Sequence, residues 1–356
     1  MSFSLRIRRI LVWIILTASV IVFAGAMIFL ALQMSGKMRL ERQTKGIVPR
    51  LFGSDPMEAS ILADNWQEGD VLYQGVHYRY NDDILTFLFL GIDRMEEVKA
   101  AEVGNDGGQA DAIFLLVLNP HTKEISIIGI DRNTMTDVDV YDRSGAFVAT
   151  QTLPLCLQHD YGDGLQLSCE RSEAAVSNLF CGIPISGYCA VNMGAIPLIN
   201  DAVGGVKITA LEDVPDSNIR EGDEVLLEGQ SAYYYLHNRD GKVPESARMR
   251  LERQIQYVTA YSETTLASLK ENPTLPIGLY QILGKYMVTD VSLDEVSYLA
   301  TQAADYKFDA ERIYLPEGKT VPVDILQSAY LDEGFYPDET AFYELMLKVF
   351  YEEVED

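Results

Sequence analysis

The chain has 356 residues and a formal net charge of −25, from 28 basic and 53 acidic side chains. Residues 1–50 contain eight basic side chains and one acidic one, whereas the rest of the chain contains 20 basic and 52 acidic ones. A domain this acidic repels the phosphate backbone of nucleic acids, so we expect no nucleic-acid partner. Hydrophobic residues make up 48% of the chain, which supplies a packed core and excludes a disordered protein.

An apolar run near the N-terminus predicts a membrane anchor. Residues 10–32 are uncharged and mostly apolar, and as a helix they are long enough to cross a hydrocarbon core of about 30 Å. We expect a short cytoplasmic tail at residues 1–9, a single-pass anchor at 10–32 in the cell membrane, and an extracytoplasmic C-terminal domain. A cleaved signal peptide is the alternative, because Ala24, Gly25 and Ala26 resemble a cleavage site, although the apolar run continues beyond them.

Four cysteines follow this run within a short stretch: Cys156, Cys169, Cys181 and Cys189. They form neither a CxxC motif nor a Cys/His metal spacing. Outside the cell one or two disulfides are compatible with their number, and the sequence does not choose among the three possible pairings. Four free, buried thiols are the alternative.

The remaining pattern predicts an α/β domain. Residues 33–83 are polar and indicate a stalk and a segment that leads into the domain. Almost continuously apolar runs then indicate buried strands, at Ile84–Leu90, Ile113–Leu118 and Ile125–Ile130. Helical patterns follow at Arg171–Phe180, Ala195–Val203, Leu251–Leu269, Ser292–Ala303 with a capping box, and after Asp338. We predict a three-layer α-β-α sandwich with a mixed central sheet, formed by a domain at 84–270 and an extension at 271–356 packed on it.

A hairpin between the second and third apolar runs brings charged residues together. The turn at 119–123 predicts antiparallel pairing of residues whose numbers sum to 243, which places Asp111 opposite Arg132. Asp93 follows the first strand and can reach the same edge of the sheet. Two carboxylates and a guanidinium can hold a divalent cation and a phosphate. The alternative is that these charges only mark the ends of strands.

Arginines form a second cluster. Four of the eleven arginines beyond residue 50 lie within 15 positions, at Arg239, Arg248, Arg250 and Arg253. On a helix Arg250, Arg253 and Gln254 share one face, and planar guanidinium donors suit a pyrophosphate. Solvated helix charges paired with neighbouring glutamates are the alternative.

These motifs, taken in order, resemble those of the LytR-CpsA-Psr family from residue 84 to the C-terminus. The matching segments are ILTFLFLGIDR (84–94), GQADAIFLLVLNP (108–120), EISIIGIDRNT (124–134), GIPISGYCAVNMGAIPLINDAVGGVKI (182–208), LEGQSAYYYLHNRD (227–240), RLERQ (250–254) and KYMVTDVSLDEVSYLA (285–300).

The resemblance implies an extracytoplasmic phosphotransferase that binds a polyprenyl-pyrophosphate lipid, with its tail in an apolar tunnel. Such enzymes move a lipid-linked glycopolymer, for example teichoic acid or capsule, onto peptidoglycan, with Mg²⁺ at the pyrophosphate. By motif position Asp93 and Asp111 would bind the magnesium. The arginines Arg132, Arg239 and Arg250 would be catalytic, and together with Arg253 and Gln254 they would contact the pyrophosphate.

Several family positions are replaced. The family's Pro-Arg-Asp is Asp131-Arg132-Asn133 here, its Arg-x-Arg is His237-Asn238-Arg239, and an Asp three residues before Arg250 is Ala247. These replacements favour an alternative in which the protein is a non-catalytic relative that binds lipid pyrophosphate or regulates the envelope. Hydrolysis of the same lipid pyrophosphate is a third possibility.

Overall fold

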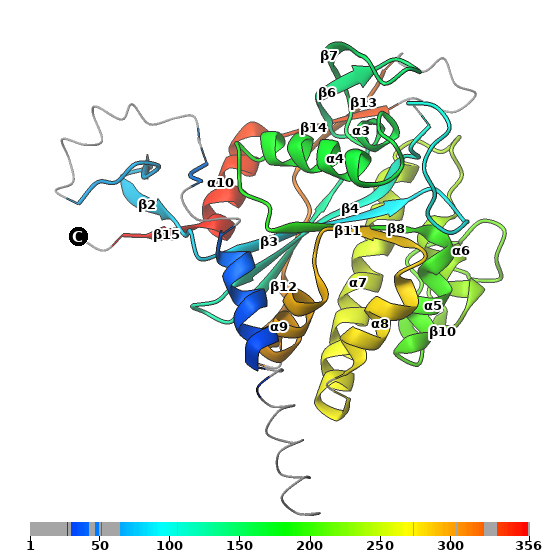
Figure 1. Cartoon of the computed structure of the whole chain (residues 1–356). Helices are drawn as coiled ribbons and strands as arrows, with labels where there is room; N and C mark the ends of the chain where they lie inside the picture. The colour runs from blue at the N-terminus through cyan, green and yellow to red at the C-terminus, as the bar shows by residue number, and fades with distance from the viewer. Residues whose placement is uncertain are drawn as a thin grey trace, which may run out of the picture.

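A computed structural model describes residues 27, 30–42, 47–49, 51, 65–104, 106–272, 274–303, 305–323 and 333–354. At its centre lies a six-stranded sheet in the order β11-β8-β3-β4-β5-β12 (Figure 1). The bounds are β3 Leu85–Ile92, β4 Ala110–Asn119, β5 Glu124–Ile130, β8 Gly187–Asn192, β11 Met287–Thr289 and β12 Lys307–Tyr314. Strands β3, β4 and β5 are antiparallel neighbours, whereas β8 runs parallel to β3 and β12 parallel to β5. The three predicted strands and the mixed central sheet are therefore confirmed.

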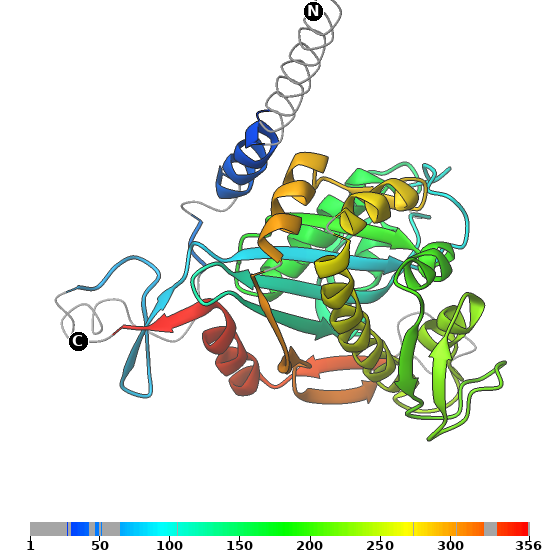
Figure 2. The same cartoon turned by 90° about the horizontal axis from the view of Figure 1, so that it is seen from below.

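Helices lie on both faces of this sheet (Figures 1 and 2). One face carries α4 (Gln166–Leu179) and α10 (Glu339–Phe350), and the other carries α7 (Ser246–Glu271), α8 (Leu275–Leu283) and α9 (Leu293–Ala303). The remaining helices are α3 Leu157–Asp160, η1 Met193–Ala195, α5 Ile196–Ala202 and α6 Gln230–His237. The remaining strands are β6 Met135–Tyr141, β7 Phe147–Pro154, β9 Val206–Thr209, β10 Glu224–Leu227, β13 Gly318–Pro322 and β14 Glu333–Pro337.

Two predicted helix starts are confirmed by their hydrogen bonds. At α9 the backbone N–H of Ser292 donates to the carboxylate of Glu295 at 2.7 Å, which is half of a capping box. At α10 the Asp338 carboxylate accepts from the N–H groups of Thr340 and Ala341 at 3.1 and 3.0 Å. Helix α7 begins at Ser246, earlier than expected, because its first residues (SARMR) alternate polar and apolar side chains and so lack helical periodicity.

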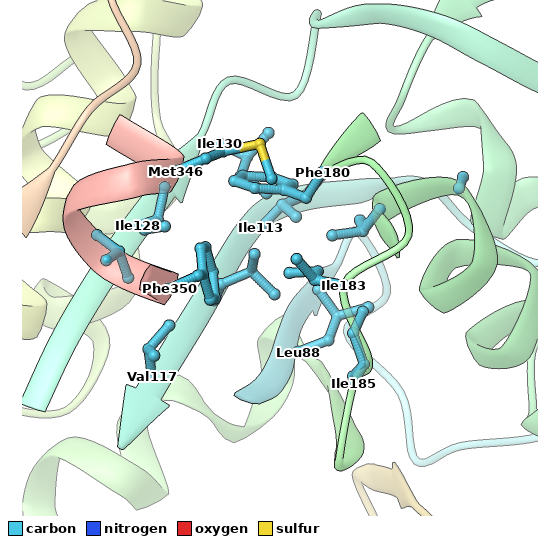
Figure 3. Packing of buried hydrophobic residues seen from close by; sticks show 14 of the residues in the cluster. Leu88, Ile113, Val117, Ile128, Ile130, Phe180, Ile183, Ile185, Met346 and Phe350 are labelled. Carbon is cyan, nitrogen blue, oxygen red and sulfur yellow. The ribbon is translucent and has the colours of Figure 1, made fainter. Parts of the chain in front are cut away.

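The core lies between the sheet and the α4/α10 face. Leu88, Ile113 and Ile128 are each 0–2% exposed, and they come from the three central strands (Figure 3). Phe180, at the end of α4, is fully buried, with its ring centroid 4.9 Å from that of Phe342 and 6.3 Å from that of Phe350. This aromatic cluster joins the two helices above the sheet.

We expect the Phe180→Ala variant to lower the free energy of unfolding by about 3–5 kcal/mol, because it leaves a cavity among rings that cannot close over it. Phe147, which is 57% exposed, offers the matched control, and Phe147→Ala should change stability little. Urea denaturation of both variants measures the difference. Equal effects would contradict the role of Phe180 in the core.

Glu173 on α4 adds a pH-dependent contribution to stability. Burial, together with the charges of Asp290 and Glu170, raises the pKa of Glu173 to about 7. The raised pKa means that the folded state favours the neutral acid. The contribution of Glu173 to the stability of the folded state is therefore fully present below the unfolded-state pKa and is lost as pH rises toward 7. We expect Glu173→Gln to raise the melting temperature at pH 8 and hardly at pH 4. The exposed Glu263→Gln should show no such trend in the same thermal scans.

All four cysteines are free thiols, with Cys156 and Cys169 buried. The alternative of free, buried thiols is therefore confirmed for Cys156 and Cys169, whereas Cys181 and Cys189 are free but only partly buried.

The N-terminal region contributes a helix and two strands to the described fold. Residues 30–42 form a helix, and β1 (Val71–Tyr73) and β2 (Val76–Tyr80) form a small sheet in which β2 pairs with the C-terminal β15 (Tyr351–Glu353). The predicted anchor at 10–32 falls outside the described residues except at 27 and 30–32.

Among the residues that the structure describes, no helix is both long and apolar enough to cross a membrane.

Candidate functional site

The hairpin of β4 and β5 has the register that the sequence predicted. Ile113 pairs with Ile130 and Leu118 with Ile125, so paired residue numbers sum to 243. This register brings Arg132 against Asp111, and an Nη1 atom of the guanidinium donates to Asp111 Oδ1 in a close ion pair. The predicted meeting of these two residues at the open end of the hairpin is confirmed.

Asp111 binds a second arginine, which comes from α7. Arg250 Nη1 lies 2.9 Å from Asp111 Oδ2, so each carboxylate oxygen faces one guanidinium. Burial alone would raise the pKa of Asp111, but the charges of Arg250 and Arg132 outweigh it and lower the pKa below its usual value. The carboxylate is therefore ionised at neutral pH and fixes both arginines at one place.

Because this carboxylate is 7% exposed and paired twice, we expect Asp111→Asn to lower the free energy of unfolding by about 3–5 kcal/mol at pH 7. A lowered pKa gives stability that is present above the unfolded-state pKa of about 3.9 and lost as pH falls below it. The deficit of the variant should therefore shrink in acid. Chemical denaturation from pH 7 to pH 3 tests this, with the exposed Asp137→Asn as the control.

Asp93 lies at the same edge of the sheet, just after β3. Its Oδ1 accepts a hydrogen bond from the backbone N–H of Gln109 at 2.7 Å. Partial desolvation and the nearby charge of Asp111 raise the pKa of Asp93. Because the charge of Asp111 disfavours the ionised form of Asp93, a cation bound beside the two carboxylates would stabilise that ionised form.

The two carboxylates fit a magnesium ion only if the phosphates of a bound substrate supply further ligands. No group of three or more His, Cys, Asp or Glu side chains is placed to hold a metal within the described ranges. Magnesium commonly binds through one or two carboxylates together with substrate phosphates, and Asp93 presents an exposed carboxylate for this. Each oxygen of Asp111 already faces a guanidinium, so Asp111 would have to offer its remaining lone pairs to the metal.

Arg239 is the unneutralised cation of the site. Its Nη1 donates to the hydroxyl of Ser246 at 2.9 Å, and within the described part of the chain no carboxylate lies at ion-pair distance. Burial, followed by the charges of Arg250 and Arg132, lowers the pKa of Arg239. A guanidinium destabilised by two like charges is a site that an anion would stabilise.

The structure places Arg253 and Gln254 differently from Arg250. Arg253 is 1% exposed, pairs with Glu212 at 2.7 Å and donates to the carbonyls of Tyr235 and Asn238. Gln254 Nε2 donates to the carbonyl of Leu236 at 3.1 Å. Both side chains hold the end of α6 against α7 in these contacts, and their direct binding of pyrophosphate stays a prediction.

Two apolar chambers lie along the sheet face opposite to the core, and together they are called here the apolar channel. The chamber beside the Asp111 cluster, called here the head-side chamber, has a volume of about 410 Å³ and includes Gly91, Ala112, His237 and Gln254 in its wall. The chamber farther from the Asp111 cluster, called here the tail-side chamber, has a volume of about 350 Å³, lies between the sheet, α8 and α9, and includes Pro120, Lys123 and Tyr306 in its wall. Three residues, Phe89, Leu116 and Cys189, line both chambers. The two chambers are therefore neighbours on this face of the sheet.

Two contacts of the site had no signal in the sequence. Arg132 Nη2 donates to the Sγ of Cys156 at 3.0 Å, and its buried Nε has no hydrogen-bond partner among the described residues. Ser246, which holds Arg239, begins α7. The sequence indicated Cys156 only as a possible disulfide partner and gave no indication for Ser246, because neither residue belongs to a motif with a known spacing.

Each family position that lost a charged side chain is occupied by an uncharged residue or a histidine, at Asn133, His237 and Ala247. Ala247 is buried in the first turn of α7, and the backbone carbonyl of Asn133 accepts from Phe335 N–H at 2.8 Å. His237 stacks on Tyr233, with ring centroids 4.9 Å apart. Asp131 is 3% exposed, and burial raises its pKa, so its carboxyl is withdrawn from the surface of the site.

Comparison with known proteins gives relatives of one kind. The chain is 24% identical over 258 residues to the polyisoprenyl-teichoic acid–peptidoglycan teichoic acid transferase TagU of Bacillus cereus, covering 72% of this chain and 76% of the relative. The TagU of Oceanobacillus iheyensis is 24% identical over 286 residues, covering 79% of each chain.

Two solved structures have the same fold. The crystal structure of B. subtilis TagV matches with a TM-score of 0.54 and 17% identity, covering 75% of this chain and 96% of that one. The structure of TagT bound to LIIa-WTA matches with a TM-score of 0.53 and 17% identity, covering 75% and 89%.

A sequence model of the LytR_cpsA_psr family matches residues 57–323. This match starts before the first motif at residue 84 and takes in β1 and β2, which the sequence had assigned to the segment leading into the domain. Since the match covers most of the chain and agrees with the ordered motifs, the protein belongs to the LytR_cpsA_psr family.

Proposed function

We propose that this protein is a membrane-anchored phosphotransferase that moves a glycopolymer from a polyprenyl-pyrophosphate carrier to peptidoglycan. The observation that carries the proposal is the junction of an apolar channel with a cluster of arginines around Asp111. A polyprenyl-pyrophosphate has the same two parts, an apolar tail and a compact polyanion. The names of the TagU relatives support teichoic acid as the class of polymer.

The arginines have separate tasks in this proposal. Arg239 binds the pyrophosphate because no carboxylate neutralises it among the described residues, while Arg132 and Arg250 are held in place by Asp111. Guanidiniums fixed before the substrate arrives stabilise charge that develops on the phosphate during transfer, without the cost of reorganising. Asp111 is in this view a positioning residue as well as a proposed magnesium ligand.

The reaction forms one bond and breaks one. A sugar hydroxyl of peptidoglycan attacks the phosphorus next to the glycopolymer, and the oxygen that bridges the two phosphorus atoms leaves with its electron pair on polyprenyl phosphate. The hydroxyl proton passes to solvent. Asp93 and Asp111 would hold Mg²⁺, which when bound supplies positive charge to the phosphate oxygens.

The test is the release of polyprenyl phosphate from a polyprenyl-pyrophosphoryl saccharide with magnesium and peptidoglycan present. The unmodified chain should release it, and Asp93→Asn should slow release without the loss of stability expected for Asp111→Asn. An Asp93→Ala/Asp111→Ala variant that works at the unmodified rate would show that the metal site is assigned wrongly.

The replaced acids favour a second candidate, a relative that binds lipid pyrophosphate without turnover. Ala247 leaves the first turn of α7 without the family's carboxylate, and Asp131 is buried. Tight binding with no product for any donor would select this candidate, and detected transfer would remove it. Release of polymer into water instead of onto peptidoglycan would select hydrolysis.

A further inference from the structure

The helix at residues 30–42, called here the N-terminal helix, is docked on α9 (Figures 1 and 2). Gln33 Nε2 donates to the carbonyl of Ser297 at 3.0 Å, and the hydroxyl of Thr301 donates to Gln33 Oε1 at 2.8 Å. One turn nearer the start of α9, the hydroxyl of Ser35 donates to Asp294 Oδ2 at 2.7 Å. The two helices are therefore joined by side-chain hydrogen bonds along their shared side.

The docking depends on a glycine. A Cβ atom added at Gly36 would lie 2.4 Å from the backbone carbonyl oxygen of Asp294, so only glycine lets the two backbones come this close. Leu40, one turn further, is 1% exposed. Gln33, Gly36 and Leu40 follow the i, i+3, i+7 spacing of a single helix face. The contact is thus built into the sequence of the N-terminal helix.

The opposite side of α9 is a wall of the apolar channel. Val296, Leu299 and Ala300 line the tail-side chamber. A single helix therefore separates the N-terminal helix from the part of the channel farthest from the Asp111 cluster.

The outer side of the N-terminal helix is apolar and has basic neighbours. Leu30, Met34 and Met38 are 53, 64 and 47% exposed and follow an i, i+4, i+8 spacing. Lys37 and Arg42 lie on the same helix, where they suit the anionic surface of a membrane, although Lys37 also lies 3.6 Å from Glu41. Arg39 instead faces α9, where it pairs with Asp294 at 3.7 Å and adds to the docking contact. The predicted anchor ends at residue 32, so docking begins at the next residue, and at about 1.5 Å per residue Gly36 is only about 6 Å along the helix from that end.

We propose that the N-terminal helix fixes α9 against the membrane surface, so that the tail-side chamber faces the bilayer and takes up the polyprenyl tail directly from it. This inference rests on the proposed function. Leu30, Met34 and Met38 contact the interfacial region of the bilayer. Gln33, Gly36 and Leu40 hold α9, which forms a wall of the channel, at a fixed position relative to the bilayer. The pyrophosphate then lies at the far, head-side end of the channel, away from the bilayer.

The experiment uses the full chain in liposomes that contain anionic lipid. One probe is a long polyprenyl pyrophosphate in the bilayer, and the other is a short, water-soluble isoprenyl pyrophosphate, each with a photoreactive group on its tail. The test variant is Gly36→Leu, and the matched control is Ala31→Leu, which adds the same side chain at an exposed position of the same helix. We expect Gly36→Leu to lower capture of the bilayer probe about tenfold relative to the control, with capture of the soluble probe unchanged.

A second variant removes the outer stripe and keeps the docking. Met34→Glu/Met38→Glu should also lower capture of the bilayer probe and spare the soluble one. The inference is overturned if Gly36→Leu and Ala31→Leu capture the bilayer probe equally, or if both probes fall together. Capture with the expected pattern but no transfer to peptidoglycan would contradict the proposed phosphotransferase and leave this inference intact. Transfer to peptidoglycan at the same rate by all variants would contradict this inference and leave the proposed phosphotransferase intact.

Discussion

The Arg239→Gln variant should lose polyprenyl-phosphate release by about a hundredfold to a thousandfold, the usual cost of removing one preorganised donor from a site of developing negative charge. Its stability should hardly change, because Arg239 makes one hydrogen bond to Ser246 and is repelled by Arg250 and Arg132. Steady-state release assays and urea denaturation of the same preparation measure both quantities.

Two comparisons sharpen this prediction. Arg143→Gln removes an exposed arginine away from the cluster and should leave both quantities unchanged. Asp111→Asn should lower activity and stability together, since it leaves two buried guanidiniums without their shared partner. An Arg239→Gln protein that is markedly less stable would indicate that Arg239 has a structural role.

The Cys189→Trp variant should lose long polyprenyl pyrophosphates and keep short ones. Cys189 lines both chambers, so a large ring there closes the passage while the head-side chamber stays available. If even four methylene groups of the lipid tail can no longer enter the tail-side chamber, the binding free energy weakens by about 3 kcal/mol, which is roughly a hundredfold in affinity. Binding of a series of chain lengths by calorimetry gives the length at which affinity stops rising.

Cys189→Ser is the near-isosteric control and should bind every length as the unmodified chain does. Leu116→Trp narrows the same passage from strand β4, which β3 separates from the β8 strand of Cys189, and should give the same cut-off in length. If both tryptophan variants bind long and short lipids equally, the two chambers do not form the path of the tail.

The part of the site that the sequence predicted depends on local geometry. The turn at 119–123 sets the register of β4 and β5, and the register alone brings Asp111 to Arg132. The i, i+3, i+4 face of α7 likewise placed Arg250 near Gln254, but it could not show that Arg253 turns to Glu212 and the end of α6. That difference depends on a tertiary contact between residues far apart in the chain, for which helix periodicity carries no information.

The sequence could not show which apolar residues line the channel and which pack in the core. Along β4, Ile113 and Leu115 pack in the core, whereas Phe114 and Leu116 line the cavity on the other face. Both faces need apolar residues, so the strand is apolar throughout, and only the position of α7, α8 and α9 decides which face is filled. The docking of residues 30–42 on α9 was unpredicted for the same reason, because it joins segments more than 250 positions apart.

The small sheet of β1, β2 and β15 decides how the chain can be shortened for experiments. Phe350 accepts a backbone hydrogen bond from Asn81, and the backbone carbonyl of His77 accepts from Val354, so the last strand closes on the first ones. A fragment that starts at β3 would expose Tyr351 and the end of α10 to water, although it would keep every proposed site residue. Recombinant fragments without the apolar N-terminal run should therefore begin before Asp70 and retain the chain through Val354.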